Sequence, residues 1–216
     1  MVPIHNIVWD WNGTLVDDAW VFVKTMNHLL QKTNLPPTSL EDYKKNFCFP
    51  VEAYWKKIGF SLTEDEFNKK NAFFITQYQK RMFLPLLHPG IKKLLFSLNR
   101  KKIQQFVLSA SEHSLLQKSI EHYGLKSLFI DCLGVNNLNA KGKESVGKKL
   151  LNKHNLNNKH TLFIGDTEYD VRVGEALGCR VVLVSFGHIS HTRLLKTKKP
   201  VFSCIKELSS FLLSNQ

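Results

Sequence analysis

The pattern of hydrophobic and polar positions divides the chain into three parts. Residues 4–9 form a short apolar run, which is typical of a buried β-strand. In residues 17–85 apolar side chains recur at spacings of three and four, as they do on one face of an α-helix. After residue 90, helical stretches alternate with short apolar runs, which predicts right-handed βαβ units and a parallel sheet.

The helical stretch begins with an amphipathic helix predicted at residues 17–33, with Asp17 and Asp18 in its first turn. Ser39 and Thr63 are predicted to cap two later helices. A long helix with an aromatic face is predicted from Phe67, Phe73, Phe74, Tyr78 and Met82. No strand pattern interrupts this stretch, which is too long for an ordinary crossover and indicates a small helical insert.

The alternating part of the chain predicts the remaining elements of one domain. Helices are expected near residues 91–99, 112–123, 144–154 and 168–177. Strands are expected at residues 103–108, 128–133, 160–164 and 181–185. With residues 7–9 as first strand, these elements predict an α/β fold with a Rossmann-like parallel sheet core and an inserted all-helical domain. The predicted core comprises residues 1–16 and 86–216, and the predicted insert comprises residues 17–85.

Composition adds few constraints to this fold. The chain of 216 residues carries 30 Lys and Arg against 18 Asp and Glu, a net charge of +12. Basic residues are not interleaved with aromatic residues in a stripe, so we expect a Lys-rich solvated surface and no nucleic-acid partner. The four cysteines form no Cys-x-x-Cys pair, and no signal peptide or membrane span is recognisable. We therefore expect a cytoplasmic protein with no membrane association, either a monomer or a homodimer.

Candidate chemistry lies where the predicted strands end. Asp10 and Asn12 follow the first strand, Ser109 ends the second, and Asp166 and Asp170 follow the fourth. The carboxyl ends of parallel strands meet at one edge of a sheet, which is where ligands bind. Carboxylates from two such strands make a hard oxygen site suited to Mg²⁺.

Each of these segments also has a purely structural interpretation. Gly13 and Thr14 fit an ordinary turn that caps a helix, and a helix N-cap explains Ser109 equally well. Lys141 and Lys143 open a predicted helix, where the positive end of the helix dipole disfavours cations. This placement suggests a lysine directed at an anion.

The four motifs in this order resemble those of haloacid dehalogenase (HAD) superfamily phosphatases, in the group similar to phosphoglycolate phosphatases. The resemblance covers essentially the whole chain, with the insert in the place of the helical cap domain. It implies that Asp10 is the nucleophile and that Asp166 and Asp170 are the acids of the fourth motif. Residues 140–143, Ala-Lys-Gly-Lys, resemble the Ala-x-[Ser/Gly]-Lys wording of one subgroup, which favours Lys143 over Lys141 as the motif lysine.

The resemblance also implies a mechanism, hydrolysis of a small phosphorylated metabolite through an aspartyl-phosphate on Asp10. Mg²⁺ would be held by Asp10, Asp166 and the backbone carbonyl of Asn12. Asp170 would support Lys143 or a metal-bound water. The expected phosphate-binding residues are Gly13, Thr14, Ser109, Ala110 and Lys143.

One position departs from the pattern of the family. Its phosphatases usually carry an acid/base Asp two residues after the nucleophile, where this chain has Asn12. General acid/base catalysis contributes about 10²- to 10⁴-fold, and an amide cannot supply it. Another group could substitute, the leaving group could need no proton, or the chain could be a weakly active or non-catalytic binding protein. A phosphonate hydrolase would need a lysine from the cap, for which Lys24, Lys44 and Lys56 are the candidates.

Two other groups of residues are interpreted as structural. His88 and His188 stand beside Pro or Gly in predicted loops and are not expected to be catalytic bases. Tyr54, Trp55 and Phe60 could line a substrate pocket but fit the core of the insert better.

Overall fold

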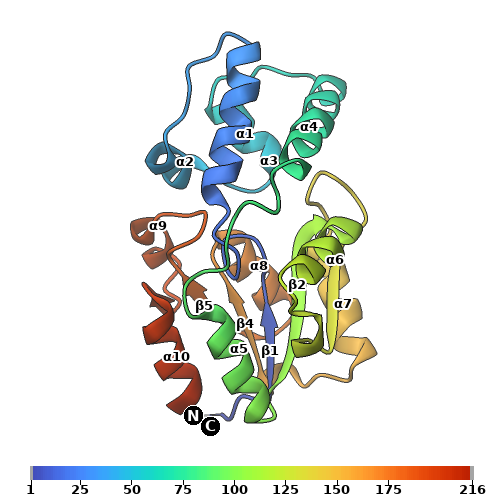
Figure 1. The fold of residues 1–216 in the computed structure, drawn as a ribbon, viewed down its shortest axis with the longest axis vertical. Coiled ribbons are helices and arrows are strands. Elements are labelled where there is room, and N and C mark those ends of the chain that lie inside the picture. The colour runs from blue at the N-terminus through green and yellow to red at the C-terminus, as the bar shows by residue number, and fades with distance from the viewer. Residues whose placement is uncertain (1, 215–216) are drawn as a thin grey trace.

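The computed structural model describes residues 2–214 and contains a six-stranded parallel sheet with the strand order β3-β2-β1-β4-β5-β6 (Figure 1). The strands are β1 (Asn6–Trp9), β2 (Gln104–Glu112), β3 (Asp131–Val135), β4 (Thr161–Gly165), β5 (Arg180–Val184) and β6 (Val201–Phe202). β1 lies at the centre, paired in parallel with β2 and β4. The predicted α/β fold with a Rossmann-like parallel sheet is therefore confirmed.

Helices cover both faces of the sheet because side chains alternate between the faces along each strand. Ile7 and Trp9 of β1 pack in one buried cluster with residues of α5 (Ile91–Arg100), α6 (His113–His122) and α10 (Ile205–Ser214). Val8 packs in the other cluster. That second cluster includes residues of α7 (Lys143–Lys153), α8 (Glu168–Ala176) and α9 (His191–Leu195).

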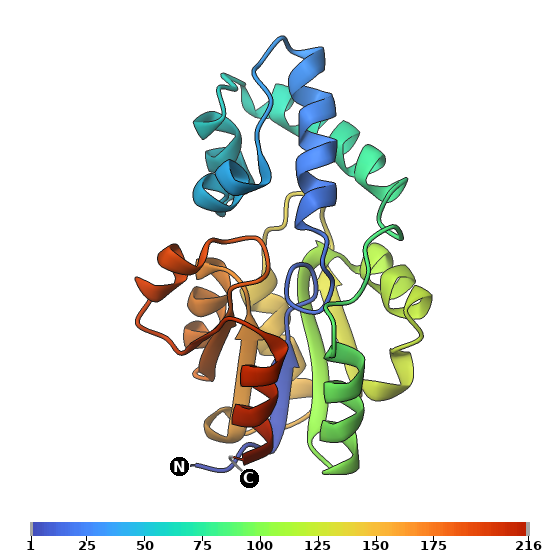
Figure 2. The ribbon, with the colours of Figure 1, turned by 60° about the vertical axis from the view of Figure 1, so that its left-hand side comes forward.

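Four of the five helices between β1 and β2 lie together beyond the carboxyl ends of the strands (Figures 1 and 2). They are α1 (Ala19–Lys32), α2 (Leu40–Asn46), α3 (Val51–Lys57) and α4 (Glu64–Gln79), and with their connections we call them the helical insert. Trp55 packs against Phe60, Phe67 and Phe74 with ring centroids 5.0, 5.1 and 6.3 Å away, so the insert has an aromatic core of its own.

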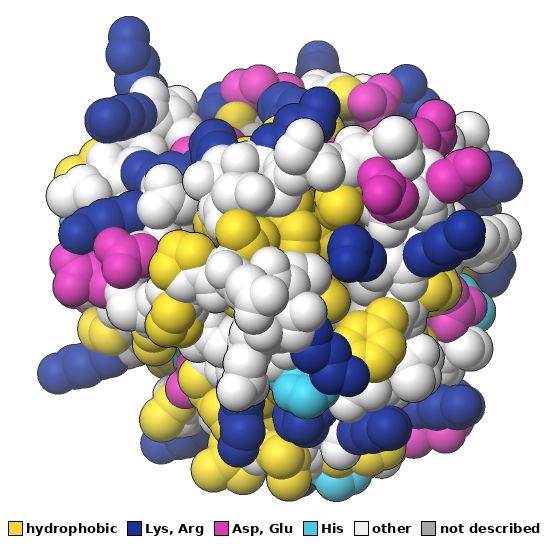
Figure 3. Space-filling view, turned by 90° about the horizontal axis from the view of Figure 1, so that it is seen from above, with side chains coloured by type: hydrophobic (Ala, Val, Ile, Leu, Met, Phe, Trp, Pro, Cys, Tyr) yellow, Lys and Arg dark blue, Asp and Glu magenta, His cyan; other side chains and the backbone are white. Residues whose placement is uncertain are grey.

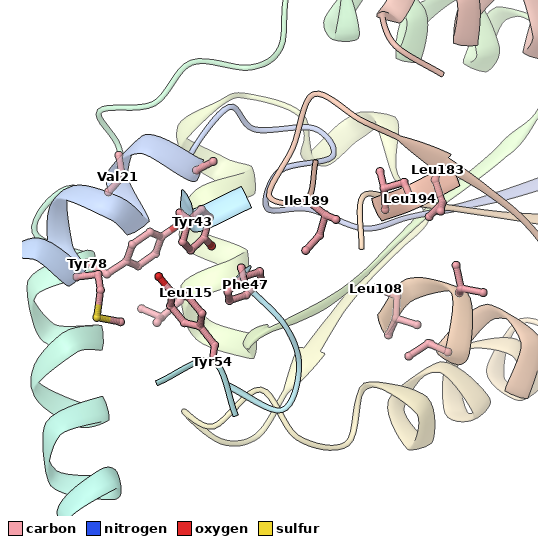
Figure 4. Packing of buried hydrophobic residues seen from close by; sticks show 14 of the residues in the cluster. Val21, Tyr43, Phe47, Tyr54, Tyr78, Leu108, Leu115, Leu183, Ile189 and Leu194 are labelled. Atoms are coloured by element: carbon pink, nitrogen blue, oxygen red, sulfur yellow. The ribbon is translucent and has the colours of Figure 1, made fainter. Parts of the chain in front are cut away.

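The insert and the sheet domain share a single buried cluster. Tyr43, Phe47 and Tyr78 from the insert belong to the same cluster as Leu115 and Leu183 from the sheet domain. Figure 4 shows these side chains at the boundary, with the rings of the insert directed toward the sheet domain. This continuity places the insert directly over the strand ends.

Most predicted helix starts and strands agree with the structure. Ser39 and Thr63 are the N-caps of α2 and α4, and Thr63 forms a capping box with Glu66. The third strand was placed too early, because residues 126–128 form a 3₁₀ turn and β3 begins only at Asp131. Leu128 and Phe129 are buried at this turn, and the predicted strand overlaps β3 at residues 131–133.

Two further observations concern the helices. Met82 lies beyond the end of α4, although its side chain is buried in the same cluster. Among residues 2–214, none of the helices combines the length and the apolar character required to cross a bilayer.

Candidate active site

The carboxyl ends of β1 and β4 bring two carboxylates together at the middle of the sheet. Asp10 directly follows β1, and its backbone N–H donates to the carbonyl of Ile164 in β4 at 2.8 Å. Asp166 follows β4 by one residue. Carboxylate oxygens of Asp10, Asp166 and Asp170 all lie within 4.8 Å of one another, and all three residues are buried. The structure thus brings the predicted acids to one place.

Lys143 is the cation of this cluster. It is the first residue of α7, and its Nζ donates to Asp10 Oδ1 at 2.5 Å and to Asp170 Oδ1 at 2.6 Å. Its side chain is 1% exposed. Lys141 points elsewhere, with a side chain 57% exposed and paired with Glu52 at 2.9 Å. Of the two candidate lysines, only Lys143 reaches the cluster.

Asp170 holds Lys143 in place while it caps α8. Its Oδ2 accepts hydrogen bonds from the backbone N–H and the hydroxyl of Thr167, at 3.0 and 2.7 Å. Its Oδ1 is then left to accept from Lys143. The side chain is fixed from two directions, which suits the supporting role predicted for it.

The pKa values of these groups reflect three carboxylates around one lysine. Burial raises the pKa of Asp10 to about 8, with Lys143 opposing and Asp170 and Asp166 adding to the rise. Burial also raises the pKa of Asp166 to about 6, against the opposing charge of His188. For Lys143, burial opposes the charged form, but Asp10 and Asp170 raise its pKa above the usual value. The pocket therefore has a surplus of negative charge that a cation would relieve.

The donor set fits Mg²⁺, which prefers oxygen ligands and carboxylates in particular. Asp10 and Asp166 supply carboxylates from adjacent strands, and the Thr14 hydroxyl lies between them. Thr14 Oγ1 donates to Asp166 Oδ1 at 3.0 Å and lies 3.4 Å from Asp10 Oδ2. This hydroxyl keeps the two carboxylates at a fixed separation, which favours a small ion of strict geometry.

The loop after β1 packs closely against His188 and Asp166. Gly13 has φ +74°, and a Cβ there would collide with the side chains of His188 and Asp166. The amide N–H of Gly13 donates to Asp18 Oδ1 and to the carbonyl of Val16, both at 2.9 Å. This amide, predicted to hold phosphate, is engaged within its own loop.

The predicted phosphate-binding residues of β2 lie on the wall of the same pocket. Ser109 and Ala110 both line it, and Ser109 is 1% exposed. The Ser109 hydroxyl accepts a hydrogen bond from the backbone N–H of Ser111 at 3.0 Å, so its own proton can be donated elsewhere. Ser109 and Lys143 thus line the same pocket as Asp10.

Asn12 belongs to a hydrogen-bonded network with a buried carboxylate that sequence reasoning assigned to a helix turn. Asn12 Nδ2 donates to Asp18 Oδ2 at 2.5 Å and to the Tyr78 hydroxyl at 2.9 Å. The Tyr78 hydroxyl donates to Asp18 Oδ2 at 2.8 Å, and Ser111 donates to Asn12 Oδ1 at 3.0 Å. Asp18 precedes α1 but makes no side-chain cap bond, and it is fully buried. The sequence offered no signal that separates this carboxylate from an acid in a first helical turn.

His188 completes the network, although it was interpreted as a loop histidine. Its Nε2 donates to Asp18 Oδ1 at 3.2 Å, its Nδ1 lies 2.7 Å from the Tyr43 hydroxyl, and its backbone N–H donates to Asp166 Oδ2 at 2.6 Å. Burial opposes the charged form of His188, but Asp18 raises its pKa above the usual value. Conversely, burial opposes ionisation of Asp18, while His188, Asn12 and Tyr78 hold its pKa low. The two residues form a buried ion pair beside Asn12.

The other predicted loop histidine is structural. His88 is buried outside the pocket wall, and its Nε2 donates to the carbonyl of Gly13 at 2.9 Å. Tyr54, Trp55 and Phe60 are also absent from the described pocket wall and pack in the core of the insert, as predicted.

A pocket of about 870 Å³, including the open space at its mouth, lies between the insert and the strand ends. Its floor contains Asp10, Ser109, Lys143 and Asp166, and residues of α1 and α4 form the opposite wall. The candidate lysines of a phosphonate hydrolase, Lys24, Lys44 and Lys56, are not among the described residues of the pocket wall.

Comparison with known proteins agrees with this geometry. Residues 7–184 match the family of haloacid dehalogenase-like hydrolases. A phosphoglycolate phosphatase of Haemophilus influenzae is 28% identical over 192 residues, which cover 84% of this chain and 86% of the relative.

Solved structures show the same fold over nearly the whole chain. A "predicted phosphatase from Clostridium acetobutylicum" aligns with a TM-score of 0.82 at 23% identity, covering 98% of this chain and 99% of the other. A haloacid dehalogenase-like family hydrolase of Streptococcus pneumoniae also reaches 0.82, at 20% identity, covering 98% of this chain and all of that one. The chain belongs to the haloacid dehalogenase-like hydrolase family.

Proposed function

We propose that the protein is a Mg²⁺-dependent phosphomonoesterase that hydrolyses a small phosphorylated molecule through an aspartyl-phosphate on Asp10. The observation that carries this proposal is the buried cluster of Asp10, Asp166 and Lys143 on the floor of a pocket. The names of its relatives, phosphoglycolate phosphatases among them, point to the same reaction class.

In the proposed reaction, Asp10 attacks the phosphorus atom in line with the leaving oxygen. A bond forms between an Asp10 carboxylate oxygen and phosphorus while the bond from phosphorus to the ester oxygen breaks. Lys143 and the Ser109 hydroxyl would hold the equatorial oxygens and stabilise their charge. Water then hydrolyses the acyl phosphate and restores the carboxylate.

Mg²⁺ would be held by Asp10, Asp166 and the backbone carbonyl of Asn12. When bound, it would offset the repulsion between a carboxylate nucleophile and a phosphate dianion. The helical insert would act as the cap, which excludes water and contacts the leaving group.

The leaving oxygen needs a proton that Asn12 cannot provide. Tyr78 and His188 both line the pocket, and both are hydrogen-bonded to Asp18. We assign the proton transfer to this network, which replaces the carboxylate that the family usually has at position 12. The non-catalytic and phosphonate-cleaving alternatives have no comparable support from the pocket wall.

Hydrolysis of p-nitrophenyl phosphate, measured with Mg²⁺ and with a chelator, tests the proposal. Turnover should require the metal and should fall at least about 10³-fold in Asp10→Asn, with the circular dichroism spectrum unchanged. Fluoroberyllate, which mimics an aspartyl-phosphate, should inhibit the parent enzyme. Undiminished turnover in Asp10→Asn would rule out the proposed nucleophile.

A further inference from the structure

The wall of the pocket that faces the phosphate-binding floor is apolar. It comes mainly from the helical insert, with one contribution from the loop between β3 and α7. The side chains that matter here are Phe22, Phe49, Val51, Phe74, Ile75 and Leu138. A leaving group released from a phosphate on Asp10 would lie against these side chains.

The polar groups of this wall are already engaged with protein partners. Asn71 is 3% exposed, and its Nδ2 donates to the carbonyl of Leu138 and to Asn139 Oδ1, both at 2.9 Å. The Tyr78 hydroxyl donates to Asp18. These groups position the wall itself, which leaves little hydrogen-bonding capacity for a polar leaving group.

The pocket also lacks a counter-charge for a second anionic group on the substrate. Within residues 2–214, Lys143 is the one Lys or Arg of the pocket wall, and Asp10 and Asp170 hold it on the floor. His188 also lines the pocket, but its charge is paired with Asp18. Glu112 adds a further carboxylate to the wall, and hydrogen bonds from Ser114 and Leu115 keep that carboxylate in place.

Cations near the pocket mouth have partners elsewhere. Lys141 pairs with Glu52 at 2.9 Å. The guanidinium of Arg172 lies 5.2 Å from the centroid of the Tyr169 ring and donates to the carbonyl of Phe49 at 3.4 Å. Viewed from the insert end, Lys and Arg side chains are dispersed over the surface among Asp and Glu (Figure 3). The net positive charge is therefore not concentrated at the site.

We infer that the substrate is the phosphate monoester of an uncharged, apolar alcohol, preferably an aromatic one, and not phosphoglycolate. An apolar leaving group gains from burial against the rings, roughly in proportion to the area removed from water. A carboxylate in the same position would be buried without a partner. This inference rests on the proposed phosphatase function.

A matched pair of substrates tests it. Benzyl phosphate and phosphoglycolate share a CH₂–O–PO₃ group and differ in whether the CH₂ carries a phenyl ring or a carboxylate. With Mg²⁺ present, kcat/KM for benzyl phosphate should exceed that for phosphoglycolate by at least about 100-fold. From ethyl to butyl phosphate, kcat/KM should rise about fourfold for each added CH₂.

A charge placed on the apolar wall should change this preference. Ile75 is half-buried on the pocket wall, so Ile75→Lys supplies a cation for the carboxylate of phosphoglycolate. The ratio of kcat/KM for benzyl phosphate to that for phosphoglycolate should fall about tenfold or more in this variant. The neighbouring Thr76 is exposed and outside the described pocket wall, so Thr76→Lys adds the same charge without changing the ratio.

Binding of non-hydrolysable analogues separates this inference from the phosphatase proposal. Benzylphosphonate and phosphonoacetate differ by the same phenyl-for-carboxylate exchange, and benzylphosphonate should raise the melting temperature more. Equal or better hydrolysis of phosphoglycolate would overturn the inference and leave the phosphatase intact. If p-nitrophenyl phosphate is hydrolysed but neither of these two esters is, the inference fails and the phosphatase proposal stands. If none of the three is hydrolysed, the phosphatase proposal fails, and a preference for phosphonoacetate would overturn the apolar site as well.

Discussion

Asn12 and Asp18 share a buried hydrogen bond, and this bond limits what can be changed at either position. With Asn12→Asp alone, two carboxylates would meet where Asn12 Nδ2 now donates to Asp18 Oδ2 at 2.5 Å. Asp18 is fully buried, so the repulsion cannot be screened by water. We expect Asn12→Asp to lower the free energy of unfolding by about 3 kcal/mol, and one of the two groups to stay protonated.

Exchanging the two residues should recover part of that loss. In the double variant Asn12→Asp with Asp18→Asn, an amide again faces a carboxylate, although His188 loses its charged partner. Urea unfolding of the parent, both single variants and the double variant should give a coupling free energy of at least about 1 kcal/mol. In the double variant, kcat for benzyl phosphate should exceed that of Asn12→Asp, because the carboxyl group at position 12 no longer shares a proton with a second buried carboxylate at position 18. Additive effects would show that the two positions do not interact.

The Asp18–His188 ion pair predicts a specific dependence of stability on pH. The pKa of His188 is raised in the folded state from its usual value of 6.5. Its contribution to stability is therefore complete below pH 6.5 and is lost as the pH rises through the folded-state pKa. In chelator, the parent should lose stability relative to His188→Gln over this range.

A matched histidine provides the control for this measurement. His191→Gln alters an exposed residue outside the network, and its difference from the parent should not vary with pH in the same way. A constant difference between the parent and His188→Gln from pH 6 to pH 9 would show that His188 has no charged partner in solution.

At the scale of elements, α4 links local capping to the shape of the pocket. Thr63 begins this helix with a capping box, and Phe74, Ile75 and Tyr78 further along the helix line the pocket. Thr63→Ala should lower the free energy of unfolding by about 1 kcal/mol, because one backbone N–H at the helix start loses its acceptor. Thr76→Ala, in the last turn of the same helix, should have almost no effect in the same urea titration. Equal effects of the two substitutions would contradict the capping assignment.

Elements whose pattern is local could be predicted from the sequence. The order of strands and helices as far as β5 followed from periodicity, whereas α9, β6 and α10 were not predicted. Asp10 and Asp166 followed from positions at the ends of strands, and Lys143 was preferred to Lys141 because residues 140–143 resemble a family motif. The strand predicted at residues 128–133 begins too early, because Leu128 and Phe129, buried at a turn, extend the apolar run of the strand that follows. Sequence periodicity reports burial, and it does not distinguish the two backbones.

The rest of the site depends on contacts between distant segments. Asp18 has the sequence context of an acid in a helical turn, but its carboxylate turns back to Gly13, Asn12 and His188. His188 acts in the network because the loop after β5 folds over Asp166. Neither contact produces a periodic pattern in the sequence, so both could be found only from the folded structure.

At the scale of the whole molecule, the excess of buried carboxylates predicts that Mg²⁺ stabilises the fold. Burial raises the pKa of Asp10 to about 8 and that of Asp166 to about 6, so the folded protein carries an electrostatic cost that the unfolded chain avoids. A cation that binds only the folded state should add about 2.7 kcal/mol at 100 times its dissociation constant. The melting temperature should therefore rise with Mg²⁺ at pH 8.

This stabilisation should weaken as the pH falls, since protons compete with the ion for both carboxylates and their raised pKa values favour the protonated forms. In Asp166→Asn, Mg²⁺ should no longer raise the melting temperature at any pH, because only one of the two proposed carboxylate ligands, that of Asp10, remains. Asp131→Asn is the matched control, since Asp131 begins β3, at the opposite end of the strands from the cluster, and pairs with Lys153 and His154. An increment that survives in Asp166→Asn but disappears in Asp131→Asn would place the metal outside the proposed active site.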